Sequence, residues 1–476
     1  MTTAPTPRQR TIPLVGFSGK DTPSSAEINS CVHCGLCLAV CPTYRETGLE
    51  MASPRGRIYL MKAVGEGRLS LASEVFQAQM SQCLNCRACE AVCPSGVPYG
   101  SMLEASRVQL EQAKARGVNS APATRDEAAT DDALPPRPLW QRGLRGAVFG
   151  ALFKNMALFR AFSSALKLYQ QSGAQTVARA SSVIRRLGLA DAEAMLPPMS
   201  GRFVIPQGQS YPAEGVRRYS VALFTGCIMG TAFAHVHAAT IRVLQKNGCE
   251  VILPPDQGCC GALHTHGGDL DGGRALARRN LAAFAGMGLD AIIVNAAGCG
   301  STLKEYGHLL QDEEHERGAA FSNKVKDIYE FLAGIELNTA ALGRLDLTVT
   351  YQEPCHLAHA QRITAQPRKL LAAIPGLELR EMQESSLCCG SAGVYNVTQP
   401  ALAAQLGARK INHALATGAH VIATGNPGCA LQLVSELRRR GATVEVRAIV
   451  ELLDASYQQG AGARGQGAGG MGSRSS

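Results

Sequence analysis

The chain has 476 residues, enough for two or three domains, and its hydrophobic content of 46% is ordinary for a globular protein. No apolar run approaches the length of a membrane span, and the first ten residues lack the apolar stretch of a secretory signal. The net charge of +9 is mild, and no basic block with interleaved aromatic residues occurs, so we do not expect nucleic-acid binding. We expect an intracellular protein whose 17 cysteines are reduced and available as metal ligands.

Residues 1–25 are polar and contain proline, so we expect a flexible lead-in. Residues 26–110 carry two copies of one cysteine spacing, C-x2-C-x2-C-x3-C followed by proline. Bacterial ferredoxins use this spacing to bind two [4Fe–4S] clusters. The first copy consists of Cys31, Cys34, Cys37 and Cys41, and the second of Cys83, Cys86, Cys89 and Cys93.

Each iron of a cubane needs one thiolate, and the cysteine before the proline in such a run binds the other cluster. We therefore assign cluster A to Cys31, Cys34, Cys37 and Cys93. Cluster B takes Cys83, Cys86, Cys89 and Cys41. Zinc and disulfides are the alternatives, but structural zinc usually takes paired C-x2-C knuckles, and disulfides would imply an exported protein.

A helix is expected around residues 56–66, between the two runs. It begins near Arg55 and Arg57, whose guanidinium groups are candidates for hydrogen bonds to cluster sulfur or to a carboxylate, with surface solvation as the alternative. Residues 111–215 are expected to form a linker region, flexible over 120–136 because of its proline, alanine and acidic residues.

No acidic residue occurs between Asp132 and Asp191, where lysines and arginines punctuate apolar residues. This basic, amphipathic pattern favours a helix that lies on an anionic membrane surface or docks a partner helix. The alternative is a helical bridge that packs on its own domain.

From residue 220 onward, short apolar runs alternate with helical segments, which is typical of βαβ units and a parallel sheet. We expect strands at Val221–Thr225, Glu250–Leu253, Ala291–Asn295, Asp346–Tyr351 and Val421–Thr424. Helices are expected over residues 232–246, 273–286, 400–415 and 428–440.

Cysteines repeat across this half of the chain. In the first repeat a cysteine precedes a Cys-Cys-Gly string by 32 positions and another follows it by 39; the second repeat has intervals of 33 and 40. The two sets are Cys227, Cys259, Cys260 and Cys299, then Cys355, Cys388, Cys389 and Cys429. In open parallel sheets, ligand sites form outside the carboxyl ends of strands. We therefore expect each repeat, in domains 216–335 and 336–455, to bring four thiols to one crevice.

Gly261 and Gly390 are expected to let the backbone turn sharply beside the paired cysteines. The alternative for all eight cysteines is a structural role in the core, which is the role that we assign to Cys249. His264, His266 and His356 follow cysteines and are candidates for proton carriers or for contacts that orient the site, although a structural histidine is the commoner case.

The segment 456–476 is rich in glycine and serine, and we expect it to be disordered. It contains Gly460-x-Gly462-x-x-Gly465, nominally a dinucleotide-binding fingerprint. We reject this interpretation because no strand is expected before it and no helix after it.

Several strings make the chain resemble the iron–sulfur subunit of bacterial glycolate oxidase, over roughly residues 25–105 and 220–455. They are Cys31-Val-His-Cys-Gly, Pro54-Arg-Gly-Arg-Ile-Tyr-Leu60, Cys83-Leu-Asn-Cys-Arg-Ala-Cys-Glu, Gly258-Cys-Cys-Gly-Ala262, Gly298-Cys-Gly300, Lys304-Glu-Tyr-Gly307 and Leu387-Cys-Cys-Gly-Ser-Ala-Gly393.

The resemblance implies an α+β multidomain protein. An N-terminal α-helical ferredoxin domain with two [4Fe–4S] clusters is followed by duplicated α/β CCG domains like those of heterodisulfide reductase. Partner flavoprotein subunits carry the FAD and oxidise glycolate to glyoxylate, and this subunit passes the electrons to a quinone or another acceptor. It is expected in the cytoplasm or peripherally on the inner face of the cytoplasmic membrane, with no catalytic residue, flavin site or nicotinamide site of its own.

One departure from the heterodisulfide-reductase pattern concerns a fifth cysteine, which is replaced by Thr302 and Gln432 in the two repeats. Five-cysteine clusters are therefore not expected. The four remaining thiols are suited to a metal centre, a cubane or a redox-active thiol pair, and we expect at least one further cluster in the CCG domains.

Three other functions stay open. One is the equivalent subunit of a D-lactate or glycerol-3-phosphate dehydrogenase complex, the second a thiol–disulfide enzyme and the third a zinc scaffold.

Overall fold

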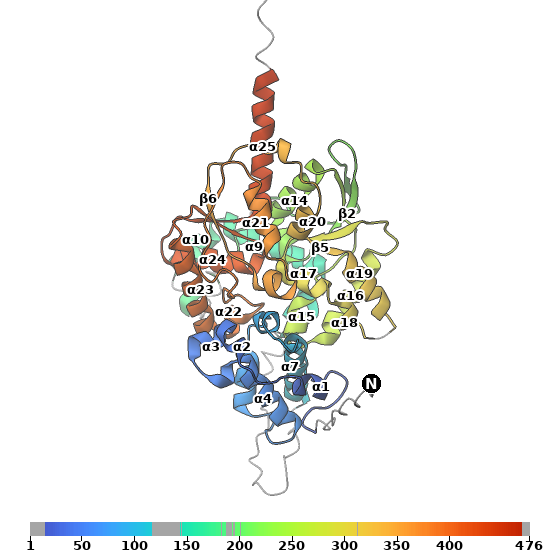
Figure 1. Ribbon diagram of the computed structural model, residues 1–476, viewed down its shortest axis with the longest axis vertical. Helices are drawn as coiled ribbons and strands as arrows, with labels where there is room; N and C mark the ends of the chain where they lie inside the picture. Colours follow the sequence, from blue (N-terminus) through green and yellow to red (C-terminus); the bar gives the residue numbers. More distant parts are fainter. Residues whose placement is uncertain are drawn as a thin grey trace, which may run out of the picture. The chain divides into compact units, whose positions relative to one another are not determined.

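The computed structural model describes residues 15–468, except 117–142, 144, 182, 187–192, 194–195, 200 and 312 (Figure 1). The chain divides into two compact units. Unit 1 contains Met1–Leu144 and the short segment Leu263–Leu270, and unit 2 contains Arg145–Ala262 and Asp271–Ser476.

Unit 1 is helical, without a strand in its described residues. Its elements are α1 (Ser25–Asn29), α2 (Leu36–Val40), α3 (Pro42–Thr47), η1 (Glu50–Ala52), α4 (Pro54–Gly65), α5 (Glu74–Gln82), α6 (Ala88–Ala91) and α7 (Tyr99–Arg116), drawn in blue in Figure 1. The helix expected around residues 56–66 is confirmed as α4. Ser53 caps it by accepting a hydrogen bond from the Gly56 N–H (3.0 Å), and Pro54 occupies its first position.

The prediction of a flexible lead-in is wrong for residues 15–24. Phe17 is buried against Phe76, with ring centroids 6.4 Å apart, and the Ser18 N–H donates to Gln109 Oε1 (3.0 Å). A single aromatic residue buries enough apolar surface to anchor an otherwise polar segment. Residues 1–14 and 120–136 lie outside the described residues.

The segment 263–270 packs within unit 1 although its neighbours in the chain belong to unit 2. Arg107 donates to the His266 carbonyl (2.8 Å), and a Cβ on Gly268 would lie 2.7 Å from the Arg107 carbonyl oxygen. The expected domain 216–335 therefore does not hold together as one piece, because these eight residues belong to unit 1.

Unit 2 contains two sheets. The first has the order β1-β3-β2-β4-β5 and the second β7-β6-β8-β9, and every pairing is parallel except that of β1 with β3. The strands are β1 (Ser210–Tyr211), β2 (Tyr219–Leu223), β3 (Cys249–Ile252), β4 (Ala291–Val294), β5 (Val325–Asp327), β6 (Thr348–Tyr351), β7 (Glu378–Leu379), β8 (Val421–Thr424) and β9 (Glu445–Ala448). The parallel sheet and all five expected strands are confirmed within two residues. The four short edge strands were not expected.

The helices of unit 2 run from cyan to red in Figure 1. They are η2 (Gly146–Leu152), α9 (Met156–Gln171), α10 (Ala174–Ala180), α11 (Val183–Arg186), α13 (Ile228–Thr231), α14 (Ala234–Lys246), α15 (Ala262–His266, which enters unit 1), α16 (Leu270–Ala283), α17 (Ala297–Leu303), α18 (Tyr306–Leu309), α19 (His315–Lys324), α20 (Ile328–Gly334), η3 (Thr339–Ala341), η4 (His356–Ala360), α21 (Ala365–Ala372), α22 (Tyr395–Thr398), α23 (Pro400–Leu415), α24 (Pro427–Arg439) and α25 (Ile449–Ala468). The four expected helices correspond to α14, α16, α23 and α24.

The two repeats of unit 2 share one hydrophobic core. Leu244 and Ile293 of the first repeat belong to the same buried cluster as Val349 and Val421 of the second, and Leu452 of α25 completes it. The units expected at 216–335 and 336–455 are therefore joined through their interiors.

The prediction of a disordered tail is wrong as far as Ala468, because α25 continues to that residue. Tyr457 is buried in the shared core, and Arg242 forms a two-bond ion pair with Asp454 (2.9 and 2.6 Å). Gly460 is needed for close packing, since a Cβ there would lie 2.2 Å from the Ala341 carbonyl oxygen. Gly460 therefore indicates a close contact of the helix α25 rather than an unfolded segment.

The basic segment before the first sheet forms α9, which packs on unit 2. Met156 and Phe159 are buried in the core of the first repeat, as expected for a helical bridge. Leu158, Phe162 and Leu168 on the same helix remain exposed. No helix among the described residues is long and apolar enough to cross a bilayer.

Candidate metal centres

The two cysteine runs of unit 1 share one backbone shape. In each, the residues two and four places after the first cysteine have positive φ: His33 (55°) and Gly35 (83°), then Asn85 (50°) and Arg87 (61°). Left-handed conformations are uncommon for residues other than glycine and persist only where the surroundings enforce them. Turns of this kind present successive N–H groups to an anion and occur at many iron–sulfur sites.

Side chains from outside the runs hold both loops. Arg55 Nη1 donates to the His33 carbonyl (3.0 Å), while Arg55 Nε pairs with Glu50 (2.7 Å). Asn85 Nδ2 donates to Glu104 Oε1 (2.9 Å). These contacts hold the shape of both loops.

One cavity of unit 1 is bordered by thiols from both runs. Its lining includes Cys31, Cys34, Cys37 and Cys93, together with Cys89. The first four are those that the spacing assigns to cluster A. The structure thus brings Cys93 to the first run, from which it is separated by more than fifty residues in the chain.

Cys41 lies near cysteines of the second run as well as of its own. Burial raises the pKa of Cys89 well above its usual value, and negative charge on Cys86, Cys83, Glu90 and Cys41 raises it further. The charge of Cys41 also raises the pKa of Cys37, after the larger effects of burial and of Cys31. Cys41 is itself buried, with Thr43 Oγ1 at 3.3 Å from its sulfur.

Arg57 lies between Cys41 and Cys83 and is completely buried. Its Nε donates to the Gln79 carbonyl (2.7 Å) and its Nη1 to Thr43 Oγ1 (3.1 Å). Burial alone would lower the pKa of Arg57, but negative charge on Cys83, Tyr99 and Cys41 raises it above the usual value.

These residues fit iron–sulfur clusters. The buried Nη2 of Arg57 has no hydrogen-bond acceptor among the described residues, so this cation points to an anionic group that would accept from it. No three described His, Cys, Asp or Glu side chains surround one point as single-ion ligands do. The four thiolates of a cubane bind different irons, so they need not converge.

His266 supports the second loop from the segment 263–270. Its Nδ1 lies 2.7 Å from Glu104 Oε1 and 3.2 Å from Asn85 Nδ2. Burial acts to raise the pKa of Glu104, but the hydrogen bond and charge of His266 lower it below the usual value. Glu104 is thus ionised and orients Asn85. His264 and His356 are buried.

The four expected cysteines of the first CCG repeat meet in unit 2. Cys227 and Cys299 follow the carboxyl ends of β2 and β4, as predicted, and Cys260 Sγ lies 3.2 Å from Cys299 Sγ. Cys227 is hydrogen-bonded to Cys259, and Cys259 to Cys260. The turn depends on Gly261, which has φ +89°.

The second repeat brings its four cysteines together in the same way. Cys355 and Cys429 follow β6 and β8, and Cys355 Sγ lies 3.9 Å from Cys388 Sγ. Cys389 is hydrogen-bonded to Cys388 and Cys429. Gly390 again has φ +89°, and a Cβ there would lie 2.6 Å from the Ala403 carbonyl oxygen. Both sets therefore have the predicted strand-end geometry.

Hydrogen bonds join the loops of the two repeats. Asn426 Oδ1 accepts from the Gly298 N–H (3.2 Å), while its Nδ2 donates to Cys429 Sγ (3.4 Å). Gln361 Nε2 donates to the Ala297 carbonyl (3.0 Å). The loop that carries Cys299 of the first repeat is therefore hydrogen-bonded to a residue that also contacts Cys429 of the second.

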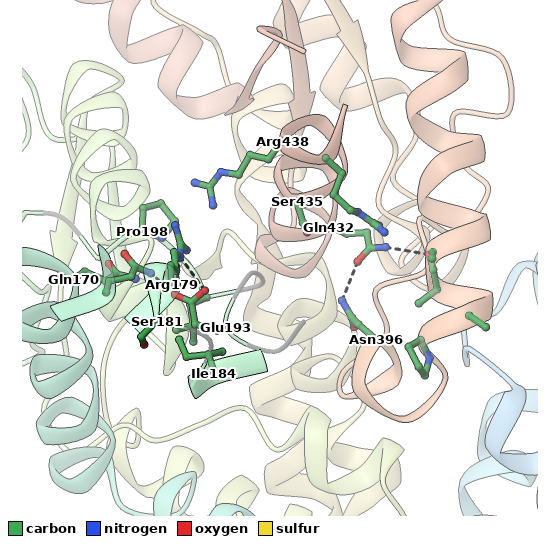
Figure 2. Close-up of a pocket in the computed structure, with 17 residues that line it drawn as sticks. Gln170, Arg179, Ser181, Ile184, Glu193, Pro198, Asn396, Gln432, Ser435 and Arg438 are labelled. Carbon is green, nitrogen blue, oxygen red and sulfur yellow. Dashed lines mark hydrogen bonds and ion pairs between the residues drawn. The ribbon is translucent and has the colours of Figure 1, made fainter. Parts of the chain in front are cut away.

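The residues that replace the fifth cysteines are engaged elsewhere. Thr302 Oγ1 donates to the Gly298 carbonyl (3.3 Å). Gln432 accepts from Asn396 (2.9 Å) and donates to the Ala403 carbonyl (3.0 Å), as Figure 2 shows. Gln432 is thereby held in the wall of a cavity of about 820 Å³ rather than turned to the thiols.

This cavity of unit 2 is lined by both polar and apolar side chains. Arg179 pairs there with Glu193 (2.9 Å), and Arg438 extends from α24 into the cavity (Figure 2). Its lining residues include no cysteine, so the thiol sites of unit 2 are separate from this cavity.

Several residues beside these sites were not expected from the sequence. Tyr99 donates to Cys83 Sγ (3.4 Å), Asn280 and Tyr306 lie beside the first CCG turn, and Lys410 lies beside the second. Lys410 could have been identified from the sequence, because it is a charged residue on the apolar stripe of α23 that also contains Leu406 and Ala414. Tyr306 belongs to the string Lys304-Glu-Tyr-Gly307, whereas Tyr99 and Asn280 have no local pattern that marks them.

Cys249, which we assigned to packing, is fully buried at the start of β3 in the shared core. We expect the Cys249→Ala variant to keep the iron content of the wild type, because no cysteine set includes this residue. Iron assay of anaerobically purified protein tests this. Loss of iron with retained folding would place Cys249 among the ligands.

Family models match four segments of the chain. The model of the 4Fe-4S dicluster domain matches residues 27–97, and that of the cysteine-rich domain matches 221–304 and 349–434. Residues 140–196 match the linker region of the glycolate oxidase iron-sulfur subunit.

Curated relatives agree with these matches. A probable glycolate oxidase iron-sulfur subunit of Bacillus subtilis is 39% identical over 90% of this chain and 94% of its own length. A glycolate oxidase iron-sulfur subunit of Escherichia coli is 33% identical over 91% and 95%. Lactate utilization protein A of Shouchella clausii is 29% identical over 49% of this chain and 98% of its own length.

Proposed function

Because this chain belongs to the family of glycolate oxidase iron–sulfur subunits, we propose that it is the electron-transfer subunit of a flavin-dependent glycolate dehydrogenase complex. Partner flavoprotein subunits carry the FAD and oxidise glycolate to glyoxylate, and this chain passes the electrons to a quinone-type acceptor. Iron–sulfur clusters take up single electrons, which lets them divide the pair that a flavin receives. We place no substrate-oxidising step on this chain.

The observation that carries the proposal is the arrangement of the eight cysteines in unit 1. Cys93 borders a cavity with three cysteines of the first run, and Cys41 lies near Cys89 and the buried charge of Arg57; both support the proposal. Exchange of the fourth ligand keeps two clusters close together, which suits electron transfer between them. We propose cluster A on Cys31, Cys34, Cys37 and Cys93, and cluster B on Cys83, Cys86, Cys89 and Cys41.

We also propose a cytoplasmic location with peripheral contact to the inner face of the membrane. The exposed Leu158, Phe162 and Leu168 of α9, with Arg160 and Lys167 on the same helix, support such a contact. This contact would bring the chain to a quinone dissolved in the bilayer.

A second candidate function is the same role in a D-lactate dehydrogenase complex. It is favoured by the likeness to lactate utilization protein A, which covers about half of this chain. The substrate preference of the purified complex also tests the same role in a glycerol-3-phosphate dehydrogenase complex.

Anaerobic purification of the chain with its partners should yield flavoproteins, bound FAD, iron and acid-labile sulfide. The complex should reduce an artificial acceptor with glycolate faster than with D-lactate or glycerol 3-phosphate. Preference for another substrate would reassign the complex. If no flavoprotein copurifies and the isolated chain reduces disulfides, the result would favour a thiol–disulfide enzyme. Zinc in place of iron would favour a structural scaffold.

The Cys86→Ala variant separates electron transfer from substrate oxidation. In the variant complex, glycolate should still bleach the flavin absorbance, because that step occurs on the partner. Reduction of the downstream acceptor should be lost. The Cys249→Ala complex is the matched control and should retain both steps; flavin that is no longer reduced in an intact Cys86→Ala complex would contradict the proposal.

A further inference from the structure

The two thiol sites of unit 2 differ in the groups beside their paired cysteines. In the first repeat, Asn280 donates to the Cys259 carbonyl (3.0 Å) and Tyr306 to the Cys260 carbonyl (2.8 Å). Both groups are neutral. In the second repeat, the corresponding helix α23 presents Lys410 near the cysteines, 21 residues after Cys389, as Asn280 is 20 residues after Cys260.

Lys410 is a buried cation, with 1% of its side chain exposed. Its Nζ donates to the carbonyl oxygens of Glu384 (2.5 Å) and Ser385 (3.0 Å). An ammonium group has three N–H donors and a full charge, and burying that charge is costly unless an anion lies close by.

The neighbouring carboxylates are already paired with other cations. Glu384 forms a two-bond ion pair with Arg409 (2.7 and 2.8 Å), and Glu353 pairs with Arg368 (2.6 Å). No carboxylate among the described residues accepts a hydrogen bond from Lys410. The charge of Glu384 also acts on Lys410, but less than that of the nearby cysteines.

Lys410 Nζ binds the carbonyl groups that lie four and three residues before Cys388, which places its charge beside the thiols of the second repeat. Burial lowers the pKa of Lys410, and negative charge on Cys389, Cys388 and Cys429 opposes this effect. Hydrogen bonds from Cys388 and Cys429 lower the pKa of Cys389 well below its usual value, and the charge of Lys410 adds to this.

Hydrogen bonding between the thiols and burial raise the pKa of most cysteines in both repeats: Cys227, Cys259 and Cys260 in the first, and Cys388 and Cys429 in the second. The repeats differ in the groups beside their turns, which are neutral in the first repeat and include the buried Lys410 in the second. Deprotonated thiols are the form that binds metal.

We propose that Lys410 is a positioning residue that holds net negative charge on the site formed by Cys355, Cys388, Cys389 and Cys429. It thereby makes this site the more readily reduced of the two thiol sites in unit 2. A nearby fixed positive charge stabilises the reduced, more negative form of a redox centre. The second repeat is then the end point of electron flow within unit 2.

Reduction of the centre at this site adds one electron and forms or breaks no covalent bond. The electron comes from the flavoprotein of the proposed complex. This identity of the electron donor is the only part of the inference that rests on the proposed function. The charge asymmetry between the two sites holds for any electron donor.

The Lys410→Gln variant of the complex tests the proposal, because an amide still donates to the two carbonyl groups while the charge is removed. Lys369→Gln is the matched control: Lys369 is exposed in the same repeat and donates to the Ala333 carbonyl (2.8 Å). The readout is the midpoint potential of the iron–sulfur EPR signal that is missing from a Cys388→Ala variant.

This midpoint should fall by at least 59 mV in Lys410→Gln, a tenfold change in a one-electron equilibrium, and stay unchanged in Lys369→Gln. Equal midpoints in Lys410→Gln and wild type would overturn the proposal. So would a Cys388→Ala variant that retains every wild-type signal. The potential is titrated with dithionite and mediators instead of glycolate. An unchanged midpoint would therefore contradict the role of Lys410 without contradicting the proposed function.

Unfolding separates the electrostatic role from simple packing. Loss of the lysine charge should lower the unfolding temperature of the iron-loaded protein more than that of the iron-depleted protein, because a bound iron–sulfur centre holds all four cysteines as thiolates. Equal destabilisation of both forms would mean that Lys410 only packs.

Wild-type protein provides a test that does not depend on folding of the lysine variant. The signal missing from Cys388→Ala should titrate at a higher potential than any signal missing from Cys259→Ala. The reverse order would overturn the proposal.

Discussion

The Cys41→Ala variant should lose the cluster bound by Cys83, Cys86 and Cys89, although Cys41 belongs to the other run. Cys41 is buried and lies near Cys89 of the second run and the cation of Arg57. A cubane deprived of one of its four thiolates has an iron without a protein ligand. Iron content should therefore fall by about four atoms per chain, the content of one cubane.

Reference spectra identify which cluster is lost. The EPR spectrum of Cys41→Ala should match that of Cys86→Ala, whereas Cys93→Ala should match Cys34→Ala. This reciprocal pattern would establish exchange of the fourth ligands. A Cys41→Ala spectrum that matches Cys34→Ala would instead show that each run binds its own cluster.

Arg57→Met should destabilise unit 1 and lower the potential of cluster B. The substitution removes the cation that lies beside Cys41 and Cys83 and leaves buried thiolates without their counter-charge. Breaking a buried charge pair costs about 3–5 kcal/mol. The reduced form of the cluster carries the larger negative charge, so loss of a buried cation disfavours reduction. Denaturant unfolding and EPR-monitored titration measure the two effects.

Two further variants control for this result. Arg57→Lys retains the charge but not the planar fork, so the potential should remain closer to the wild type than in Arg57→Met. Arg55→Met removes a partly exposed arginine that contacts the first loop, and the potential of cluster B should not change. An unchanged potential in a folded Arg57→Met variant would contradict the role assigned to Arg57.

The features that the sequence predicted well have local signals. The spacing of the cysteines in each run identifies the ligand loops, and the apolar strands before Cys227 and Cys429 place these thiols at the ends of a parallel sheet. The repeated intervals between cysteines indicate that the CCG domain is duplicated. These patterns are contained in short stretches of chain and need no knowledge of distant contacts.

The features that were missed depend on contacts between distant residues. His266 meets Asn85 across 181 positions of the chain, and Asn426 meets Gly298 across 128. Phe17 orders the lead-in by packing on Phe76. Nothing in the sequence around these residues indicates their partners, whereas Lys410 was detectable as a charge on an apolar helix face.

The core shared by the two repeats of unit 2 has a thermodynamic consequence. Tyr329 lies in the same buried cluster as Tyr351 and Leu452, so melting of either half exposes the apolar interior of the other. Calorimetry of this unit should therefore record a single cooperative peak. The halves of an ancestral duplication have lost their thermodynamic independence, and neither half on its own is expected to remain soluble.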